Sequence, residues 1–142
     1  MKISTKVRYG MRAMIELARR NNEAPVMLGI IAKNQDLSEK YLEQLFTMLR
    51  NAGLVKSERG NKGGYRLARK PEEISALEIF EALNGPLELV ECAMNRKSCI
   101  RSEICNTVSL WTELNQNIRG ILASRDLAQM AGSGTAFPSY DI

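Results

Sequence analysis

Three cysteines stand close together in the C-terminal half of this 142-residue chain. Six residues separate Cys92 from Cys99, and five separate Cys99 from Cys105, in a segment that lacks the apolar periodicity of a helix or a strand. Thiolates are soft ligands that favour zinc or iron–sulfur centres, and three of them leave one position for a fourth donor. The spacing differs from the Cys-x-x-Cys pattern of zinc ribbons. We therefore predict a metal centre, either zinc or an iron–sulfur cluster, held by these three cysteines.

Two alternatives to an iron–sulfur cluster stay open. Two cysteines could form a disulfide on oxidation, which would make a metal-free redox switch. The same thiols could instead hold a structural zinc ion. A secreted disulfide framework is not indicated, because the number of cysteines is odd and all three lie in one segment.

The composition narrows the classes of function. The chain contains no histidine, so the common imidazole base and ligand are missing. It also has no Gly-x-x-x-x-Gly-Lys phosphate loop and no Gly-x-Ser-x-Gly nucleophile elbow, and we predict that it is not an enzyme. No apolar run approaches the roughly 20 residues of a membrane span. We expect a cytoplasmic protein that does not bind membranes.

The N-terminal third carries the pattern of a helix-turn-helix. Apolar residues recur at helical spacing over residues 5–20, and a short helix is expected around residues 28–32. A third helix begins after Ser38, a typical N-cap, and ends at Gly53. One face of this third helix is apolar and carries Tyr41, Leu42, Leu45, Phe46 and Leu49.

A basic hairpin is predicted directly after the third helix. Residues 54–59 and 65–68 have the composition of strands, and residues 60–64 form a glycine-rich loop between them. The whole chain has a net charge of +4, and Glu58 is the one acid in a window that contains Lys56, Arg59, Lys62, Arg66, Arg69 and Lys70. The order helix, break, helix, basic hairpin predicts a winged helix-turn-helix that binds double-stranded DNA.

The chemistry of this region suits DNA, although an ordinary solvated helix and a soluble turn are the alternatives for each feature alone. A glutamine can pair with adenine, and a glutamate can accept from the amino group of cytosine. The first turns of the third helix offer Ser38, Glu39, Lys40, Tyr41, Glu43 and Gln44. Arg59 and Lys62 at the hairpin could reach phosphates or the minor groove.

The C-terminal half predicts a dimer. A capping box, Ser75 with Glu78, begins a short helix that ends near Gly85. Helical spacing resumes at residue 107, with one apolar stripe formed by Val108, Trp111, Leu114, Ile118, Ile121 and Leu122. Such a helix has few partners in so small a chain, so a second subunit is expected to cover it.

The predicted fold class is mainly α with a small β-hairpin wing. We divide the chain into a winged helix-turn-helix DNA-binding domain (1–85), a cysteine-bearing cluster-binding loop (86–106), a dimerisation helix (107–130) and a disordered tail (131–142). A change of the loop on cluster assembly would reposition the two DNA-binding domains of the dimer.

These features together resemble the winged-helix regulators that include the IscR, NsrR and RirA regulators. The resemblance rests on residues 1–10, 37–46 and 49–65 and on the three cysteines that follow, and it covers about residues 1–130. It implies a homodimer with crossed long helices that binds near-palindromic operators. It also implies a transcriptional regulator, a repressor in our prediction, of genes for cluster assembly, iron handling or nitric-oxide stress.

The resemblance assigns roles to particular residues. Tyr41, Glu43 and Gln44 are similar to base-contacting positions, with Ser38 and Lys40 beside them in the groove. Arg59 matches the residue of the wing at the minor groove. Cys92, Cys99 and Cys105 stand where the family has its cluster ligands.

The fourth ligand of the cluster is not assigned by the resemblance. The first cysteine spacing is one residue longer than in the best-known members, and Val108 replaces the histidine of IscR-type members. Arg8 stands where NsrR-type members have an acidic residue that serves the partner subunit. Glu88, Glu91, Glu103 or a small molecule could provide the ligand, and the missing histidine favours a 4Fe–4S over a 2Fe–2S cluster.

Overall fold

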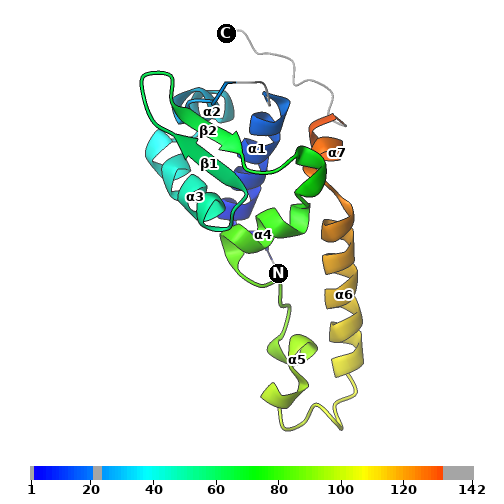
Figure 1. Ribbon diagram of the computed structural model, residues 1–142. Helices are drawn as coiled ribbons and strands as arrows, with labels where there is room; N and C mark the ends of the chain where they lie inside the picture. The colour runs from blue at the N-terminus through cyan, green and yellow to red at the C-terminus, as the bar shows by residue number, and fades with distance from the viewer. Residues whose placement is uncertain (1, 21–23, 133–142) are drawn as a thin grey trace.

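Helix α1 (Thr5–Arg19) runs through the middle of the N-terminal domain. Ser4 caps it by accepting the backbone N–H of Val7. The computed structural model, which describes residues 2–20 and 24–132, packs helices α2, α3, α4 and α7 against α1 (Figure 1). Ala13 and Met14 on its inner face are fully buried. Helix α1 is therefore the scaffold on which the other elements of this domain are placed.

The predicted helix-turn-helix is present. Helix α2 (Leu28–Gln35) ends at Asp36, which takes the left-handed conformation with a φ of 56° and turns the chain sharply. Helix α3 (Glu39–Asn51) begins after Ser38, whose Oγ accepts the N–H of Tyr41 at 3.1 Å. Gly53, with a φ of 77°, follows the end of the helix as expected.

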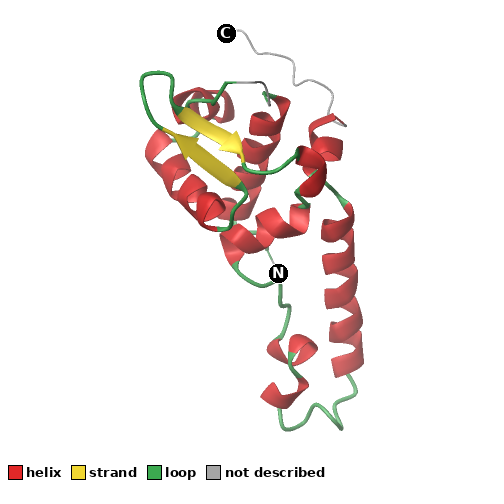
Figure 2. Cartoon of the chain, viewed as in Figure 1, coloured by secondary structure: helices red, strands yellow, loops and turns green. Residues whose placement is uncertain are grey.

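The predicted wing is also present. Strands β1 (Val55–Glu58) and β2 (Gly64–Leu67) pair antiparallel, and both are drawn in yellow in Figure 2. Val26 adds a short bridge at the other edge, exchanging hydrogen bonds of 2.9 and 2.8 Å with Tyr65. A Cβ on Gly64 would lie 2.3 Å from the Val26 carbonyl oxygen, so this bridge requires glycine there.

One apolar core joins these elements to helix α4 (Ala76–Asn84), which follows the 3-10 turn η1 (Pro71–Glu73). The capping box predicted at its start is confirmed, with Ser75 and Glu78 each accepting the other's backbone N–H. Side chains from five elements or their flanks are at most 1% exposed in this core: Ile31, Leu42, Leu45, Phe46, Leu49, Ile74, Ile79 and Leu127.

A spur, residues 86–107, projects from the domain beyond α4 (Figure 1). It contains two short helical turns, α5 (Glu91–Met94) and η2 (Arg96–Ser98), where the sequence showed no periodicity. These turns are too short to produce a detectable apolar repeat. Helix α6 (Val108–Ser124) then runs back from the spur toward the domain.

The single helix expected over residues 107–130 is divided in two. Helix α6 ends at Ser124, and helix α7 (Leu127–Gly132) packs on α1. Asp126 begins α7 by accepting the N–H of Gln129 at 2.8 Å, and Gln129 accepts the N–H of Asp126 at 3.2 Å. This second capping box is readable in the sequence and was missed. The fully buried Leu127 anchors α7 in the core.

The apolar residues that were expected to form one stripe on this helix form two separate faces instead. Val108 and Asn115 are buried, Asn115 bonds to Leu89 and Met94, and Ile118 and Leu122 pack against the core. Leu110, Trp111, Leu114 and Ile121 remain exposed. Consecutive residues of a helix point in directions less than a third of a turn apart. The spacing of the apolar residues in the sequence therefore could not distinguish the two faces.

Within the described residues no helix is both long enough and apolar enough to cross a membrane. Most of the tail predicted to be disordered, residues 133–142, lies outside the described residues, while Ala131 and Gly132 belong to α7.

Candidate DNA interface and cysteine-bearing spur

Helix α3 separates its apolar residues from a polar face that is open to solvent. Leu42, Leu45 and Phe46 are buried beneath it. The exposed side contains four of the predicted contact residues and two that the prediction omitted: Ser38, Lys40, Glu43, Gln44, Thr47 and Arg50. Thr47 and Arg50 follow Glu43 and Gln44 at helical spacing, so the periodicity already contained the signal for them.

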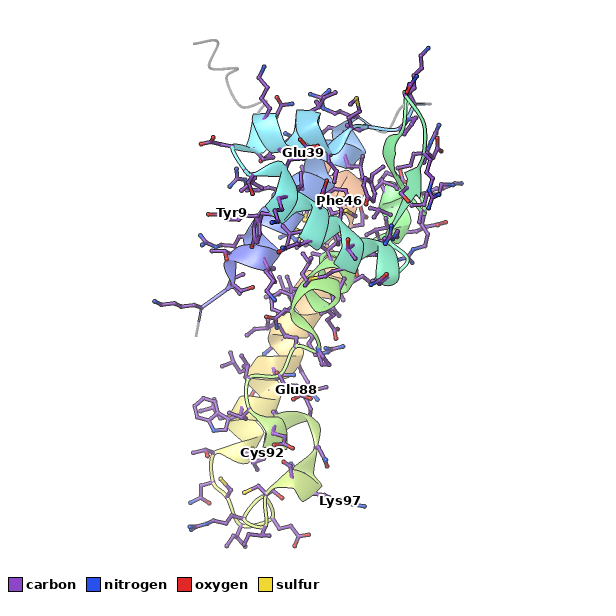
Figure 3. The ribbon with its side chains drawn as sticks, turned by 90° about the vertical axis from the view of Figure 1, so that its left-hand side faces the viewer. Tyr9, Glu39, Phe46, Glu88, Cys92 and Lys97 are labelled. Atoms are coloured by element: carbon purple, nitrogen blue, oxygen red, sulfur yellow. The ribbon has the colours of Figure 1, made fainter. Side chains whose placement is uncertain are left out.

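Tyr41 differs from the other predicted contact residues because it is half-buried. Its ring meets that of Tyr9 on α1 edge to face, with centroids 6.3 Å apart and planes at 87°. The guanidinium carbons of Arg8 and Arg12 lie 5.7 and 5.3 Å from the centre of the Tyr9 ring. Figure 3 shows Tyr9 and helix α3 at the same end of the molecule. Helix α1 thus orients the first turn of α3.

A polar network fixes α2 relative to α1. The carboxylate of Glu16 is 9% exposed and accepts hydrogen bonds from Asn34 at 2.6 Å, Gln35 at 3.1 Å and Arg20 at 3.4 Å. Arg12 donates to the side-chain oxygen of Gln35 at 2.9 Å and to its carbonyl oxygen at 2.7 Å. Because a buried carboxylate requires such partners, this network holds the C-terminal end of α2 to α1.

Fewer cations of the wing are available for DNA than the sequence suggested, because two of them are paired with acids. Arg66 forms an ion pair with Glu58 at 2.5 Å, although its buried N–H is not aligned for a hydrogen bond. Arg69 pairs with Glu78 at 2.6 Å. Lys56, Arg59 and Lys62 are exposed and form no ion pair among the residues described. These three cations leave a basic surface next to α3.

The wing is also joined to α3 through its aromatic side chains. The Tyr65 ring on β2 packs edge to face against Phe46, with centroids 4.9 Å apart. Phe46 is fully buried, so its position is fixed by the core. The polar face of α3 and the basic wing therefore belong to one rigid unit.

The three cysteines are all on the spur, which is remote from α3 (Figure 3). Cys92 belongs to α5 and is half-buried, Cys99 follows η2 and is exposed, and Cys105 is half-buried in the approach to α6. The connection between Cys99 and Cys105 is held by Ser102, which is 6% exposed and donates to the Arg96 carbonyl oxygen at 2.5 Å.

Thr107 stabilises the thiolate form of Cys105. Its Oγ1 lies 3.2 Å from the Cys105 Sγ. Hydrogen bonds from the side chain and the backbone of Thr107, with smaller contributions from the Val108 backbone and the charge of Arg101, lower the pKa of Cys105 below its ordinary value. A larger fraction of Cys105 is therefore in the thiolate form than for an ordinary cysteine at the same pH.

The spur does not form a closed metal site in this arrangement. Among the described residues, which include all three cysteines, no three cysteine or acidic side chains are grouped so as to hold a metal ion. The thiols therefore do not fit a preformed cluster. A cluster bound by all three requires the polypeptide between Cys92 and Cys105 to rearrange.

Comparison with known proteins identifies the domain that carries the candidate interface. The model of the Rrf2 family, described as an iron-dependent transcriptional regulator, matches residues 3–133. The chain belongs to the Rrf2 family. It is a DNA-binding transcriptional regulator with a winged helix, as the sequence predicted, and not an enzyme.

Proteins named CymR and IscR are among the relatives of this chain. The regulator CymR of Bacillus subtilis is 44% identical over 131 residues, which cover 92% of this chain and 90% of that protein. Its structure, that of the global cysteine regulator, superposes with a TM-score of 0.79 at 41% identity, covering 95% of this chain and 99% of that one. IscR of T. potens gives a TM-score of 0.74 at 43% identity, covering 92% and 85%.

Proposed function

We propose that this Rrf2-family regulator binds a near-palindromic operator as a homodimer, and that thiol chemistry in the spur changes its affinity for DNA. The observation that carries the proposal is the separation of two surfaces on one chain. The polar face of α3 and the basic wing suit DNA, whereas the cysteines lie on a separate spur at the far end of α6.

The exposed groups of α3 supply both direct readout and phosphate contacts. Gln44 suits the edge of adenine, and Glu43 suits the amino group of cytosine. Ser38 and Lys40 flank them at the N-terminal end, where Lys40 faces the phosphates. Tyr41 contributes its hydroxyl and the ring edge that Tyr9 leaves free. All these groups enter one major groove if α3 is the recognition helix.

The wing contributes its exposed cations. Arg59 and Lys62 flank Gly60, which has a φ of 115° and lets the hairpin turn tightly. A guanidinium on a narrow turn fits the minor groove, where the negative potential of DNA is high. Lys62 and Lys56 then neutralise phosphates and make the affinity depend on salt.

A second copy of the chain covers the exposed face of α6. Leu110, Trp111, Leu114 and Ile121 are between 36% and 61% exposed and repeat at helical spacing. Exposed apolar groups of this kind on one helix face are typical of a subunit interface. Pairing through two α6 helices places two α3 helices on one DNA duplex, as a near-palindromic operator requires.

The spur cysteines provide the response. The iron–sulfur cluster predicted from the sequence, with a 4Fe–4S form favoured over 2Fe–2S, would supply the iron and redox chemistry of the signal. The residues that would hold it are Cys92, Cys99 and Cys105. All three thiols lie within one short segment outside the core, and one has a lowered pKa. This supports a role of the cysteines as ligands and not as packed core side chains.

A metal-free thiol switch is the second candidate, and a specific observation favours it. The three thiols are not grouped as a ligand set in the described structure, and Cys99 is exposed. The similarity to CymR, the global cysteine regulator of Bacillus subtilis, also supports this candidate. In this case two spur cysteines form a disulfide on oxidation.

The deciding experiment is anaerobic purification of the full chain, followed by visible absorption and assays of iron and sulfide. A brown protein with matched iron and sulfide supports the cluster, and the iron count separates 2Fe–2S from 4Fe–4S. A colourless protein that stays free of iron after reconstitution contradicts it. Zinc released from such a protein on denaturation identifies the structural zinc alternative. The triple substitution of the cysteines by serine is the control for non-specific iron.

Operator binding then tests the regulatory step. The affinity of the wild-type chain for operator DNA is measured in the cluster-loaded, reduced apo and oxidised apo forms. A difference between two of these forms supports the proposal. Equal affinities in all three, with the triple serine variant also equal, would show that the spur does not control DNA binding.

A further inference from the structure

The side chain of Asn115 is the buried polar group that joins α6 to the spur. It is 1% exposed in the middle of α6. Its Oδ1 accepts the backbone N–H of Leu89 at 2.9 Å, and its Nδ2 donates to the sulfur of Met94 at 3.1 Å. The first bond fixes the orientation of the amide, because a backbone N–H requires an oxygen acceptor.

The two hydrogen-bond partners of Asn115 lie on either side of Cys92 in the sequence. Leu89 precedes α5 and Met94 is its last residue, so the amide bonds the segment on both sides of this cysteine. These two bonds hold the chain on either side of Cys92 to α6. If α5 shifts, the amide is left buried without partners, which is costly in the protein interior.

The C-terminal part of α6 is bonded to the DNA-binding domain. Arg119, one turn after Asn115, pairs with Glu81 of α4 at 3.0 Å. The Arg125 carbonyl oxygen, just beyond α6, accepts the N–H of Ala76 at the start of α4 at 2.8 Å. Helix α4 packs in turn on α1 and α3. Helix α6 thus connects the bonded spur at one end with the scaffold of α3 at the other.

We infer that Asn115 is a positioning residue that couples the conformation of the spur around Cys92 to α6, and through α6 to the DNA-binding domain. The regulatory part rests on the proposed function, whereas the local part does not. Movement of α5 breaks both bonds of Asn115, so a change at the cysteines is opposed by the buried amide and is transmitted to α6. A substitution that removes the amide frees the spur from α6.

The first test measures the reactivity of each cysteine in the full-length, reduced and metal-free protein. Alkylation by N-ethylmaleimide is followed by peptide mass spectrometry. Asn115→Ala should accelerate the alkylation of the half-buried Cys92 by about tenfold or more, since local opening becomes easier. The exposed Cys99 should keep its rate and serves as the internal reference. Gln116→Ala, at the adjacent exposed position, is the matched control.

Met94→Leu is the second variant. It removes the acceptor of the amide while keeping a similar side-chain volume, so it tests the bond without emptying the site. It should accelerate the labelling of Cys92 in the same direction as Asn115→Ala. If both variants label Cys92 at the wild-type rate while remaining folded, the inference is overturned.

The second test measures operator affinity in two of the three forms, which are cluster-loaded, reduced apo and oxidised apo. The two forms chosen are those whose affinities differ most in the wild-type protein. In Asn115→Ala the ratio of these affinities should fall toward one, while Gln116→Ala keeps the wild-type ratio. A purely structural role would lower both affinities equally and leave the ratio unchanged, which overturns the coupling. A wild-type ratio of one contradicts the proposed function instead, and the labelling of Cys92 then still decides whether Asn115 holds the spur.

Discussion

Tyr9 and Tyr41 meet edge to face with their centroids 6.3 Å apart, which links helix α1 to the first turn of α3. The guanidinium groups of Arg8 and Arg12 also lie over the Tyr9 ring. The side chain that stands at the predicted base-contacting position is therefore oriented by a residue that precedes the helix-turn-helix.

Tyr9→Ala should weaken operator binding about 2- to 10-fold, since an aromatic pair of this kind contributes about 0.5–1.5 kcal/mol. Tyr9→Phe keeps the ring and should bind like wild type. Titration of labelled operator by fluorescence anisotropy measures both. A Tyr9→Ala chain that is folded and binds normally would show that Tyr41 does not need this support.

Gln44→Ala and Lys62→Ala should weaken DNA binding in two different ways. Loss of Gln44 should reduce the discrimination between operator and random DNA by about 1–3 kcal/mol. Loss of Lys62 should weaken both DNAs alike and lower the salt dependence by about one unit. Titrations of both DNAs over a range of salt concentrations separate the two roles. An equal loss on both DNAs for Gln44→Ala contradicts base contact.

Leu114→Glu should convert the proposed dimer into a monomer, because it places a charge in the exposed apolar face of α6 that we propose as the subunit interface. Gln116→Glu adds the same charge at an exposed position of the same helix and should remain dimeric. Sedimentation velocity gives the oligomeric state. If Leu114→Glu stays dimeric, the interface lies elsewhere.

Two glycine-to-alanine substitutions should have opposite effects on stability. At Gly64 the new Cβ would lie 2.3 Å from the Val26 carbonyl oxygen, so Gly64→Ala should destabilise the wing by about 1–3 kcal/mol. At Gly120, in the middle of α6, a Cβ meets no atom within 4 Å, and Gly120→Ala should stabilise by up to about 1 kcal/mol. Urea denaturation of both variants checks the signs.

The capping box of α4 predicts a pH effect. Partial burial raises the pKa of Glu78, but the hydrogen bonds from Ser75 and the hydrogen bond and charge of Arg69 together outweigh it, so the pKa is lowered overall. A lowered folded-state pKa means that the stabilisation is present above the ordinary glutamate pKa and is lost as the pH falls through the lowered value.

Glu78→Gln tests this pH effect because glutamine keeps the capping box and removes the charge. Wild type should be more stable than Glu78→Gln by about 0.2–1 kcal/mol near neutral pH, a small value since the pair with Arg69 is partly exposed. Thermal unfolding at several pH values should show this difference disappearing in acid. A difference that persists in acid would mean that the charge is not its source.

The local elements and the chemistry that they carry follow from the order of the amino acids alone. Caps at Ser38 and Ser75, the glycine-rich turn and the apolar period of α3 are properties of neighbouring residues, so the winged helix-turn-helix could be predicted from them. The same holds for the polar face of α3 and the basic wing.

Contacts between residues of distant elements become known from the folded structure. Pairing of Arg66 and Arg69 with acids reduced the free charge of the wing, and burial of Leu127 divided the C-terminal helix. Asn115 appeared in the sequence as one polar residue in an amphipathic helix, and its role depends on Leu89 and Met94, more than 20 residues away. Such contacts arise when apolar faces are buried together, because burial selects among partners that local sequence leaves equivalent.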